Sequence, residues 1–269
     1  KLRYPLFADA PFGNSAVEEF DFLQLRSGFN FAWCHRHYYQ AKHAQYNRDQ
    51  FVNDLYLAMG QLATHGRWVH LYINGLYWGM YHVHERPDGD FMASYFGGEK
   101  EDYDALSAGN PRSGDKVAWN AMFAIANGNI ANPARYANIQ HYLDVNSLID
   151  YMVVNFFVGN TDWDGHNWRA ARKRERGAGY LMLPWDSEFA ISPNGAGVIN
   201  SPQPISNALN INVTGKNGSN RPTGLHQRLA LNTEYVVRFA DRTHKHLFNS
   251  GALTRTTASA IWRTRSDLM

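Results

Sequence analysis

The sequence predicts an α+β fold arranged in two layers or lobes. Patterns typical of β-strands dominate the first hundred residues, whereas the rest of the chain shows mainly helical patterns with one inserted hairpin. The length of 269 residues and the apolar fraction of 44% are those of a globular protein with a sizeable core. We therefore expect a β-rich N-terminal part followed by a mainly helical C-terminal part.

The N-terminal part is expected to hold strands and one helix. Residues 20–27 alternate between apolar and polar, as in a half-buried strand. A helix is predicted from the cap residue Asn47 to a stop at Gly66. Residues 67–85 contain two aromatic and β-branched runs joined by Asn-Gly at 74–75. A type I′ hairpin turn favours this pair because both positions need positive φ.

Three aromatic residues, Tyr77, Trp78 and Tyr81, lie on the second strand of this hairpin. Such side chains are able to stack on a purine or a sugar. We expect them instead to pack against the interface between the two lobes.

The later part of the chain is expected to be helical around a second hairpin. The run at 144–159 is apolar on most sides and begins at the cap residue Asp144, so this helix should lie in the core. The other expected elements are a short helix, a Gly-Gly turn and a strand over 89–109, a helix over 118–129, a hairpin over 169–190, a loop over 192–224 and helices from 225 onward.

Composition argues against several classes of protein. The formal net charge is only +2, and the basic residues are scattered apart from 169–177, so we expect no nucleic-acid partner. The single cysteine, Cys34, excludes an internal disulfide framework and is expected to be at least half-buried. No apolar run reaches the length of a membrane span. The chain begins without Met, and we expect it to be a fragment of a longer protein.

A polar run, NTDWDGHNWR at 160–169, directly follows the apolar helix. Asp162 and Asn167 are five positions apart, and Asp186 ends the next hairpin. This is the layout of the catalytic and magnesium loops of a protein kinase, in which one Asp orients the acceptor hydroxyl while the Asn and the second Asp hold the metal. The same spacing also fits a turn that merely caps the helix end.

Three segments together resemble the spore coat protein H (CotH) family of atypical protein kinases. They are LYINGLYWGMYHVHERPDGDFMASYFGG, NTDWDGHNW and LPWDSEF, in the same order as in the family. The resemblance implies a divergent two-lobed protein-kinase-like fold. It implies a single domain over 1–269, with an N-lobe over about 1–90 and a C-lobe over about 91–269.

The resemblance also implies an activity. It predicts transfer of the γ-phosphate of ATP, with Mg²⁺ or Mn²⁺, to Ser or Thr of protein substrates rich in these residues. An extracellular or cell-surface location is implied as well, and we expect a monomer.

Residue by residue, the resemblance assigns roles in the site. Asp162 would be the catalytic base, and Asn167 and Asp186 would be metal ligands. The remaining assignments are Glu188 as a possible auxiliary metal ligand, and Asp164 and His166 as residues that orient the loop.

Two further regions are candidates for cofactor binding. Where the family often has Glu-Lys-Ile-Asp after the first hairpin, this chain has Glu85 and Arg86 followed by Pro-Asp, and an arginine fork is not equivalent to a lysine at a phosphate. A kinase also needs a cation on an N-lobe strand paired with an acid on the next helix. Arg26 is the candidate cation, with Asp49 or Asp54 as its partner.

Two alternatives to an active kinase stay open. No Gly-rich phosphate loop is visible, and the expected N-lobe strand carries Arg26 where a kinase has Lys, which suits an inactive nucleotide-binding pseudokinase or surface module. The second alternative is a metal-dependent phosphoesterase with a two-metal cluster made by Asp162, Asp164, His166 and Asp186.

Overall fold

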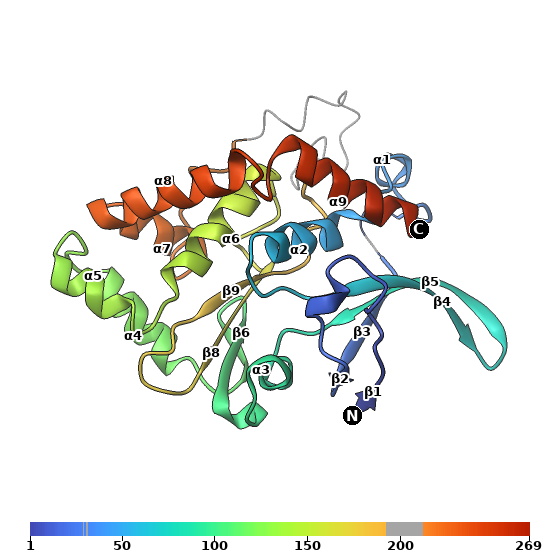
Figure 1. Ribbon diagram of the computed structural model, residues 1–269, viewed down its shortest axis with the longest axis horizontal. Coiled ribbons are helices and arrows are strands. Elements are labelled where there is room, and N and C mark those ends of the chain that lie inside the picture. The colour runs from blue at the N-terminus through green and yellow to red at the C-terminus, as the bar shows by residue number, and fades with distance from the viewer. Residues whose placement is uncertain (29, 31, 192–211) are drawn as a thin grey trace.

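The computed structural model describes residues 1–28, 30, 32–191 and 212–269. The protein has mixed α and β structure, with strands concentrated in the N-terminal part and helices dominating later, as predicted (Figure 1). The strands are β1 (Leu2–Arg3), β2 (Glu19–Phe20), β3 (Leu23–Arg26), β4 (Gly66–Ile73), β5 (Leu76–Glu85), β6 (Tyr103–Ser107), β7 (Asn110–Ser113), β8 (Trp168–Lys173) and β9 (Leu181–Pro184). The α-helices are α1 (Tyr38–Lys42), α2 (Arg48–Ala58), α3 (Gly89–Phe96), α4 (Val117–Ala126), α5 (Pro133–Ile139), α6 (Val145–Phe157), α7 (Pro222–Leu229), α8 (Thr233–Leu247) and α9 (Arg255–Asp267).

The named strands pair into antiparallel sheets. One has the order β3-β5-β4, another has the order β7-β6-β8-β9, and β1 pairs with β2. Both predicted hairpins are therefore confirmed. At the first turn Asn74 has φ 51° and Gly75 has φ 79°, the two positive values that a type I′ turn needs.

The β4–β5 hairpin is longer than the sheet to which it belongs. β3 pairs with β5 between His82 and Glu85, and the other end of the hairpin projects from the body of the molecule (Figure 1). Tyr77 and Trp78 are 55% and 60% exposed on this projection. Our prediction that they pack against a lobe interface is wrong, because no other element among the described residues extends far enough along the ribbon to cover them.

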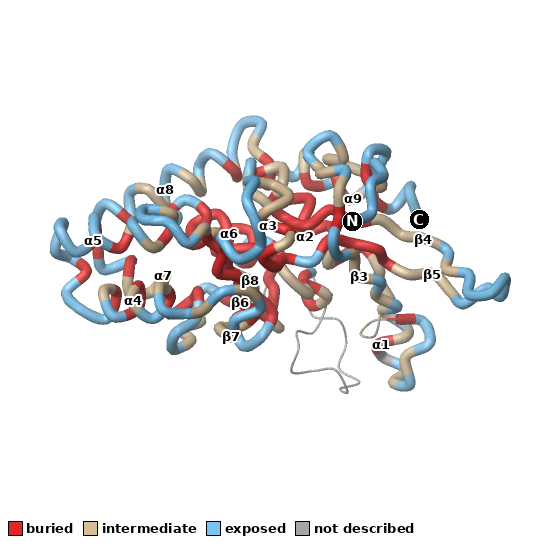
Figure 2. Tube along the Cα trace, turned by 90° about the horizontal axis from the view of Figure 1, so that it is seen from below, coloured by how far each residue is buried: buried red, intermediate tan, exposed pale blue. Residues whose placement is uncertain are grey.

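Helix α6 is the centre of the core, as its apolar pattern predicts. The Asp144 carboxylate accepts a hydrogen bond from the Ser147 amide, 2.9 Å away, and so caps the helix. The side chains of α6 pack against α7, α8 and β9, and Figure 2 shows this region as the largest buried part of the chain. Gly159, with φ 55°, turns the chain out of the helix and into the polar run.

Several local expectations need correction. Helix α2 ends at Ala58, followed by a turn at Gly60 with φ 83°, whereas Gly66 is the first residue of β4. Cys34 is exposed, not half-buried. Strand β7 was not anticipated, because its sequence Asn-Pro-Arg-Ser has no strand pattern and pairs through the backbone of β6. Of the loop predicted over 192–224, residues 192–211 lie outside the described residues. Helix α7 begins at Pro222, two positions before the predicted end of that loop.

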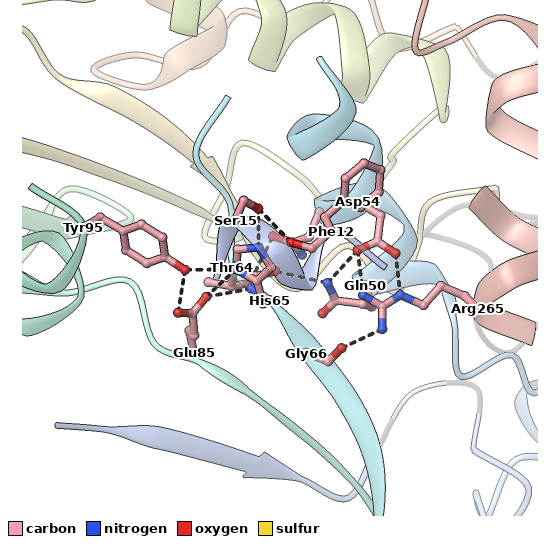
Figure 3. A network of polar contacts seen from close by, with 11 residues as sticks. Phe12, Ser15, Gln50, Asp54, Thr64, His65, Gly66, Glu85, Tyr95 and Arg265 are labelled. Carbon is pink, nitrogen blue, oxygen red and sulfur yellow. Dashed lines mark hydrogen bonds and ion pairs between the residues drawn. The ribbon is translucent and has the colours of Figure 1, made fainter. Parts of the chain in front are cut away.

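A buried ion pair joins the last helix to the N-terminal part (Figure 3). The guanidinium of Arg265 on α9 donates to both carboxylate oxygens of Asp54 on α2 and, over 2.6 Å, to the carbonyl of Gly66 on β4. Gln50, one turn before Asp54, donates to the same carboxylate over 3.0 Å. The side chains of Arg265 and Asp54 are 3% and 0% exposed, so this contact fixes α9 against α2 and the first strand of the projecting hairpin.

Among the described helices, none is both long and apolar enough to cross a membrane.

Substitution of Asp54 tests the structural role of this ion pair. Asp54→Ala leaves the buried Arg265 charge without its carboxylate, so we expect a loss of about 3–5 kcal/mol in the free energy of unfolding. Urea denaturation followed by circular dichroism measures it. Arg263→Ala, an exposed arginine on the same helix, is the control and should change stability by less than about 0.5 kcal/mol. An equally small loss for both variants would contradict the assigned role.

Acid pH should destabilise the fold through His226 on α7. Burial lowers the pKa of His226 to about 4, below the ordinary value of about 6.5 that it has in an unfolded chain. Protons therefore bind the unfolded chain more tightly, and the stability contributed by the neutral ring is lost as pH falls from about 6.5 to 4. Between pH 6.5 and 4, the melting temperature of His226→Gln should depend less steeply on pH than that of the wild type. His141→Gln, at an exposed position, is the matched surface variant.

Candidate active site

The polar run after α6 is held in place by buried side chains. Asn160 is 1% exposed and donates through its side chain to Asn155 on α6, over 3.0 Å. Trp163 is 2% exposed and packs edge-on against Tyr151 and Phe156 of the same helix. The loop between 160 and 167 is therefore a rigid extension of the core, which is what a catalytic loop requires.

Asp162 and Asn167 lie side by side in this loop. The side-chain amide of Asn167 donates to the main-chain carbonyl of Asp162 over 2.9 Å and to its carboxylate over 3.2 Å. The five-residue spacing in the sequence thus corresponds to direct contact. Because Asn167 is 6% exposed and its amide group is fixed by Asp162, its Oδ1 atom is directed away from Asp162.

The Asp162 carboxylate lies in a mixed electrostatic environment. Burial raises its pKa, His166 and Lys216 act in the opposite direction, and Asp186 raises the pKa further. The Nε2 atom of His166 is 3.6 Å from Asp162, and the imidazole is largely exposed.

The Asp164 carboxylate anchors the loop. It is 4% exposed, and its carboxylate accepts from the amide of Thr223 over 3.2 Å and from the hydroxyl of Thr223 over 2.6 Å. Its φ of 78° is strained for an aspartate, and these two bonds compensate for that strain. Asp164 therefore belongs to the support of the loop and lies outside the group formed by Asp162 and Asn167.

Lys216 is a second anchor that the sequence did not reveal. Its ammonium group donates to the carbonyls of Thr161 and Trp163, over 3.1 and 3.4 Å, and so contacts the residues on both sides of Asp162. Lys216 and Thr223 are more than fifty positions away from the loop residues that they contact. No local pattern connects them to it.

Asp186 lies two residues after the end of β9, where the chain leaves the hairpin. Its φ of 56° turns the backbone so that the carboxylate meets the guanidinium of Arg26, with an Oδ1 to Nη2 distance of 2.5 Å. Glu188, two residues later, accepts from the same nitrogen over 3.0 Å. Both predicted acidic metal ligands therefore share one cation from β3.

Arg26 also pairs with the acid of the following helix. Its Nη1 atom is 3.1 Å from the carboxylate of Asp49 on α2, whereas Asp54 is bound to Arg265. The other oxygen of Asp49 accepts from the backbone amide of Ser187, over 2.7 Å. The predicted pair of strand cation and helix acid is thus Arg26 and Asp49.

The charges around Arg26 are strongly coupled. Burial acts to lower the pKa of Arg26, but the three carboxylates outweigh this effect and raise it. Burial raises the pKa of Glu188 to about 7, against the opposing influence of Arg26 and with further raising by Asp186 and Asp49. Glu188 is therefore the carboxylate of this group that takes up a proton near neutral pH.

The structure does not bring Glu85 to this group. One oxygen of its carboxylate accepts from the amide and the ring of His65, and the other accepts from the hydroxyl of Tyr95 over 2.7 Å (Figure 3). Glu85 is 2% exposed. It follows His84, which contacts Trp185 with ring centroids 5.3 Å apart, so the alternation of side chains along β5 directs Glu85 to the opposite face. The contacts of Glu85 fit a structural role and not the predicted contact with a cofactor.

Arg86 lies at the edge of a cavity of about 430 Å³ beside the acidic group. Strand β3, the segment after β5 and the second sheet meet around this cavity. Its lining residues are Phe22, Leu23, Gln24, Leu25, Arg86, Pro87, Arg112, Arg169 and Trp185. Arg169 lies over the Trp185 ring, 4.2 Å from its centre.

The cavity carries excess positive charge. Burial and the repulsion by Arg112, with a smaller effect of Arg86, lower the pKa of Arg169 to about 10, against the attraction of Asp186. Three arginines thus approach one another beside a planar aromatic side chain, an arrangement suited to an anionic ligand with a ring system. Arg112 and Arg169 were not predicted, because they come from β7 and β8 and meet only in the folded sheet.

The donors of the site suit a hard divalent cation. Across the described ranges, no group of three or more His, Cys, Asp and Glu side chains could hold a metal ion. The side chains that the sequence predicts as metal ligands are Asp186, Glu188 and Asn167, and both carboxylates are paired with Arg26. Oxygen donors of this kind match Mg²⁺ and Mn²⁺, which keep several water ligands and need few protein ligands.

Comparisons with known proteins place the chain in a family. Among solved structures, twelve chains match. One belongs to the Shewanella oneidensis MR-1 toxin–antitoxin system HipA, HipB and its operator DNA complex, with 14% sequence identity and a TM-score of 0.27, and the match covers 82% of this chain and 53% of that one. So distant a likeness supports no inference about this chain. No curated protein matches.

The family model described as CotH kinase protein matches residues 40–259, which is most of the chain. This match confirms the resemblance carried by the three sequence segments. The protein belongs to the CotH kinase family.

Proposed function

We propose that the protein is an atypical protein kinase that transfers the γ-phosphate of ATP to Ser or Thr residues of protein substrates, with Mg²⁺ or Mn²⁺. Family membership supports a kinase-type activity. The observation that carries the finer proposal is the contact of Arg26 with both Asp49 and Asp186. This contact joins the strand cation, the helix acid and the metal-binding carboxylate that phosphoryl transfer requires.

We further propose a kinase-like division of the chain into an N-lobe over about 1–90 and a C-lobe over about 91–269. Support comes from the sheet β3-β5-β4 with helix α2 on one side, and from the helices around α6 on the other. The segment after β5, with Arg86 and Pro87, would connect the lobes. The nucleotide would occupy the arginine-lined cavity that this segment borders.

Each residue of the site has a role in this proposal. Asp186 and Asn167 would hold the metal, with Glu188 as an auxiliary ligand, and the bound cation would neutralise charge on the phosphates. Asp162 would accept the proton of the attacking hydroxyl. Asn167 would orient Asp162 through the amide contacts described above.

Arg26 would help to neutralise the phosphates from the N-lobe side. Arg86, Arg112 and Arg169 supply further positive charge around the cavity, and an arginine is a suitable partner for phosphate because its planar fork donates two parallel hydrogen bonds. Substrates rich in Ser and Thr, a monomeric state and an extracellular or cell-surface location complete the proposal.

Phosphate transfer tests the proposal directly. The purified protein with labelled ATP and Mn²⁺ or Mg²⁺ should label itself or a Ser/Thr-rich protein. Asp186→Asn should lower the rate by at least about a hundredfold, because the site loses its principal metal ligand. Asp241→Asn, an exposed carboxylate on α8, should leave the rate unchanged. Stabilisation of the fold by ATP without transfer would identify a pseudokinase. Hydrolysis of a phosphodiester without nucleotide would identify a phosphoesterase.

The pH profile tests the role of Asp162 separately. Burial raises the pKa of Asp162, so the loss of its basic form should begin at a higher pH than for an ordinary carboxyl group. kcat/KM should therefore fall as pH decreases through this raised pKa. His166→Asn removes a neighbour that lowers the pKa and should move the fall to still higher pH. An unchanged profile in this variant would exclude Asp162 as the group that titrates.

A further inference from the structure

The projecting end of the β4–β5 hairpin exposes an unusual concentration of apolar and aromatic side chains. This group, the hairpin tip, consists of Tyr72, Ile73, Leu76, Tyr77 and Trp78, which are 62%, 44%, 69%, 55% and 60% exposed. The pairs Tyr72–Tyr77 and Ile73–Leu76 are adjacent in the ladder next to the Asn-Gly turn, so their side chains lie on opposite faces of the ribbon. A cluster of exposed apolar side chains of this kind marks a surface that binds a membrane or another protein.

The hairpin tip is also free of charge. Residues 68–84 contain no Asp, Glu, Lys or Arg. A surface strand pair normally carries charged residues that prevent edge-to-edge association. Their absence means that the ribbon can leave water without the desolvation of a single ionised group.

The order of the side chains along the ribbon resembles that of a membrane interface. Ile73 and Leu76 are paired directly next to the turn, and Tyr72 and Tyr77 form the next pair. Trp78 follows on β5. Aliphatic residues thus lie outermost and amphipathic aromatic residues lie behind them, which is the distribution of side chains that anchor proteins at the level of lipid headgroups.

A positively charged segment lies at the same end of the molecule. Residues 27–48 contain no acidic residue. Within this segment Arg36 and Lys42 are exposed, and among the described residues neither forms an ion pair with a carboxylate. Figure 1 and Figure 2 both place α1 on the same side of the molecule as the hairpin. The aromatic contact between Tyr46 and Trp68, with centroids 5.4 Å apart, joins the two segments.

We propose that the hairpin tip inserts into the interface of a lipid bilayer with anionic headgroups. The apolar tip would enter between the headgroups, and Arg36 and Lys42 would lie near the negatively charged surface. A bilayer matches the tip better than a protein partner does, because insertion covers the turn and both faces of the ribbon together. Docking onto a protein would bury one face and leave the other in water.

Vesicle co-sedimentation with the full chain tests this proposal. We expect binding to vesicles of phosphatidylcholine with about a third phosphatidylglycerol, and weaker binding to phosphatidylcholine alone. Leu76→Glu together with Trp78→Glu should weaken binding at least about tenfold, because the tip would carry charge into the interface. Arg36→Gln together with Lys42→Gln should remove the preference for anionic vesicles but keep the binding that the apolar side chains of the tip provide.

Leu231→Glu is the matched control. Leu231 is 71% exposed, close to the 69% of Leu76, and lies between α7 and α8 at the other end of the molecule (Figure 1). This variant should bind vesicles like the wild type. The proposal is overturned if the wild type does not bind anionic vesicles, or if the tip variant binds as well as the control. A dimer that dissociates on substitution of the tip, seen by light scattering without vesicle binding, would assign the tip to a second copy of the chain.

Discussion

One guanidinium group, that of Arg26, connects the three parts of the chain that make up the candidate site. It contacts Asp49 on the next long helix, α2, and also Asp186 and Glu188 after β9. The last two residues are separated from Arg26 by more than a hundred positions. With its side chain 21% exposed, the cation is partly withdrawn from water, so each contact is stronger than a surface ion pair. The geometry of the acidic segment thus depends on where β3 presents this one side chain.

The sequence predicted those parts of the fold that depend on local chemistry. The Asn-Gly turn, the cap of α6 and the second hairpin are all specified by residues within a few positions of one another. The contact of Asp162 with Asn167 belongs to the same class, because both lie in one short loop. These features could be predicted without knowledge of the rest of the chain.

Contacts between distant segments were not predictable in this way. Lys216 and Thr223 hold the loop at 160–167 through contacts with residues more than fifty positions earlier in the chain. Arg112 and Arg169 meet at a cavity only because β7 and β8 both flank β6. The role of Glu85 was misjudged for a related reason. A sequence motif does not show which face of a strand looks toward the site, and a shift of one residue reverses the answer.

Arg26 and Arg265 show how far along the chain the folding unit extends. The family model matches residues 40–259, yet Arg26 and Arg265 both lie outside this range. One orders the acidic segment from the N-terminal side, and the other attaches the final helix to α2. A chain trimmed to the matched residues would still match the family model, but it would lack both arginines. Asp54 would then be buried without Arg265. Asp49, Asp186 and Glu188 would lose Arg26, the cation that they share. The residue range by which the family is recognised in sequence is therefore shorter than the range needed to pair these buried and half-buried carboxylates with cations.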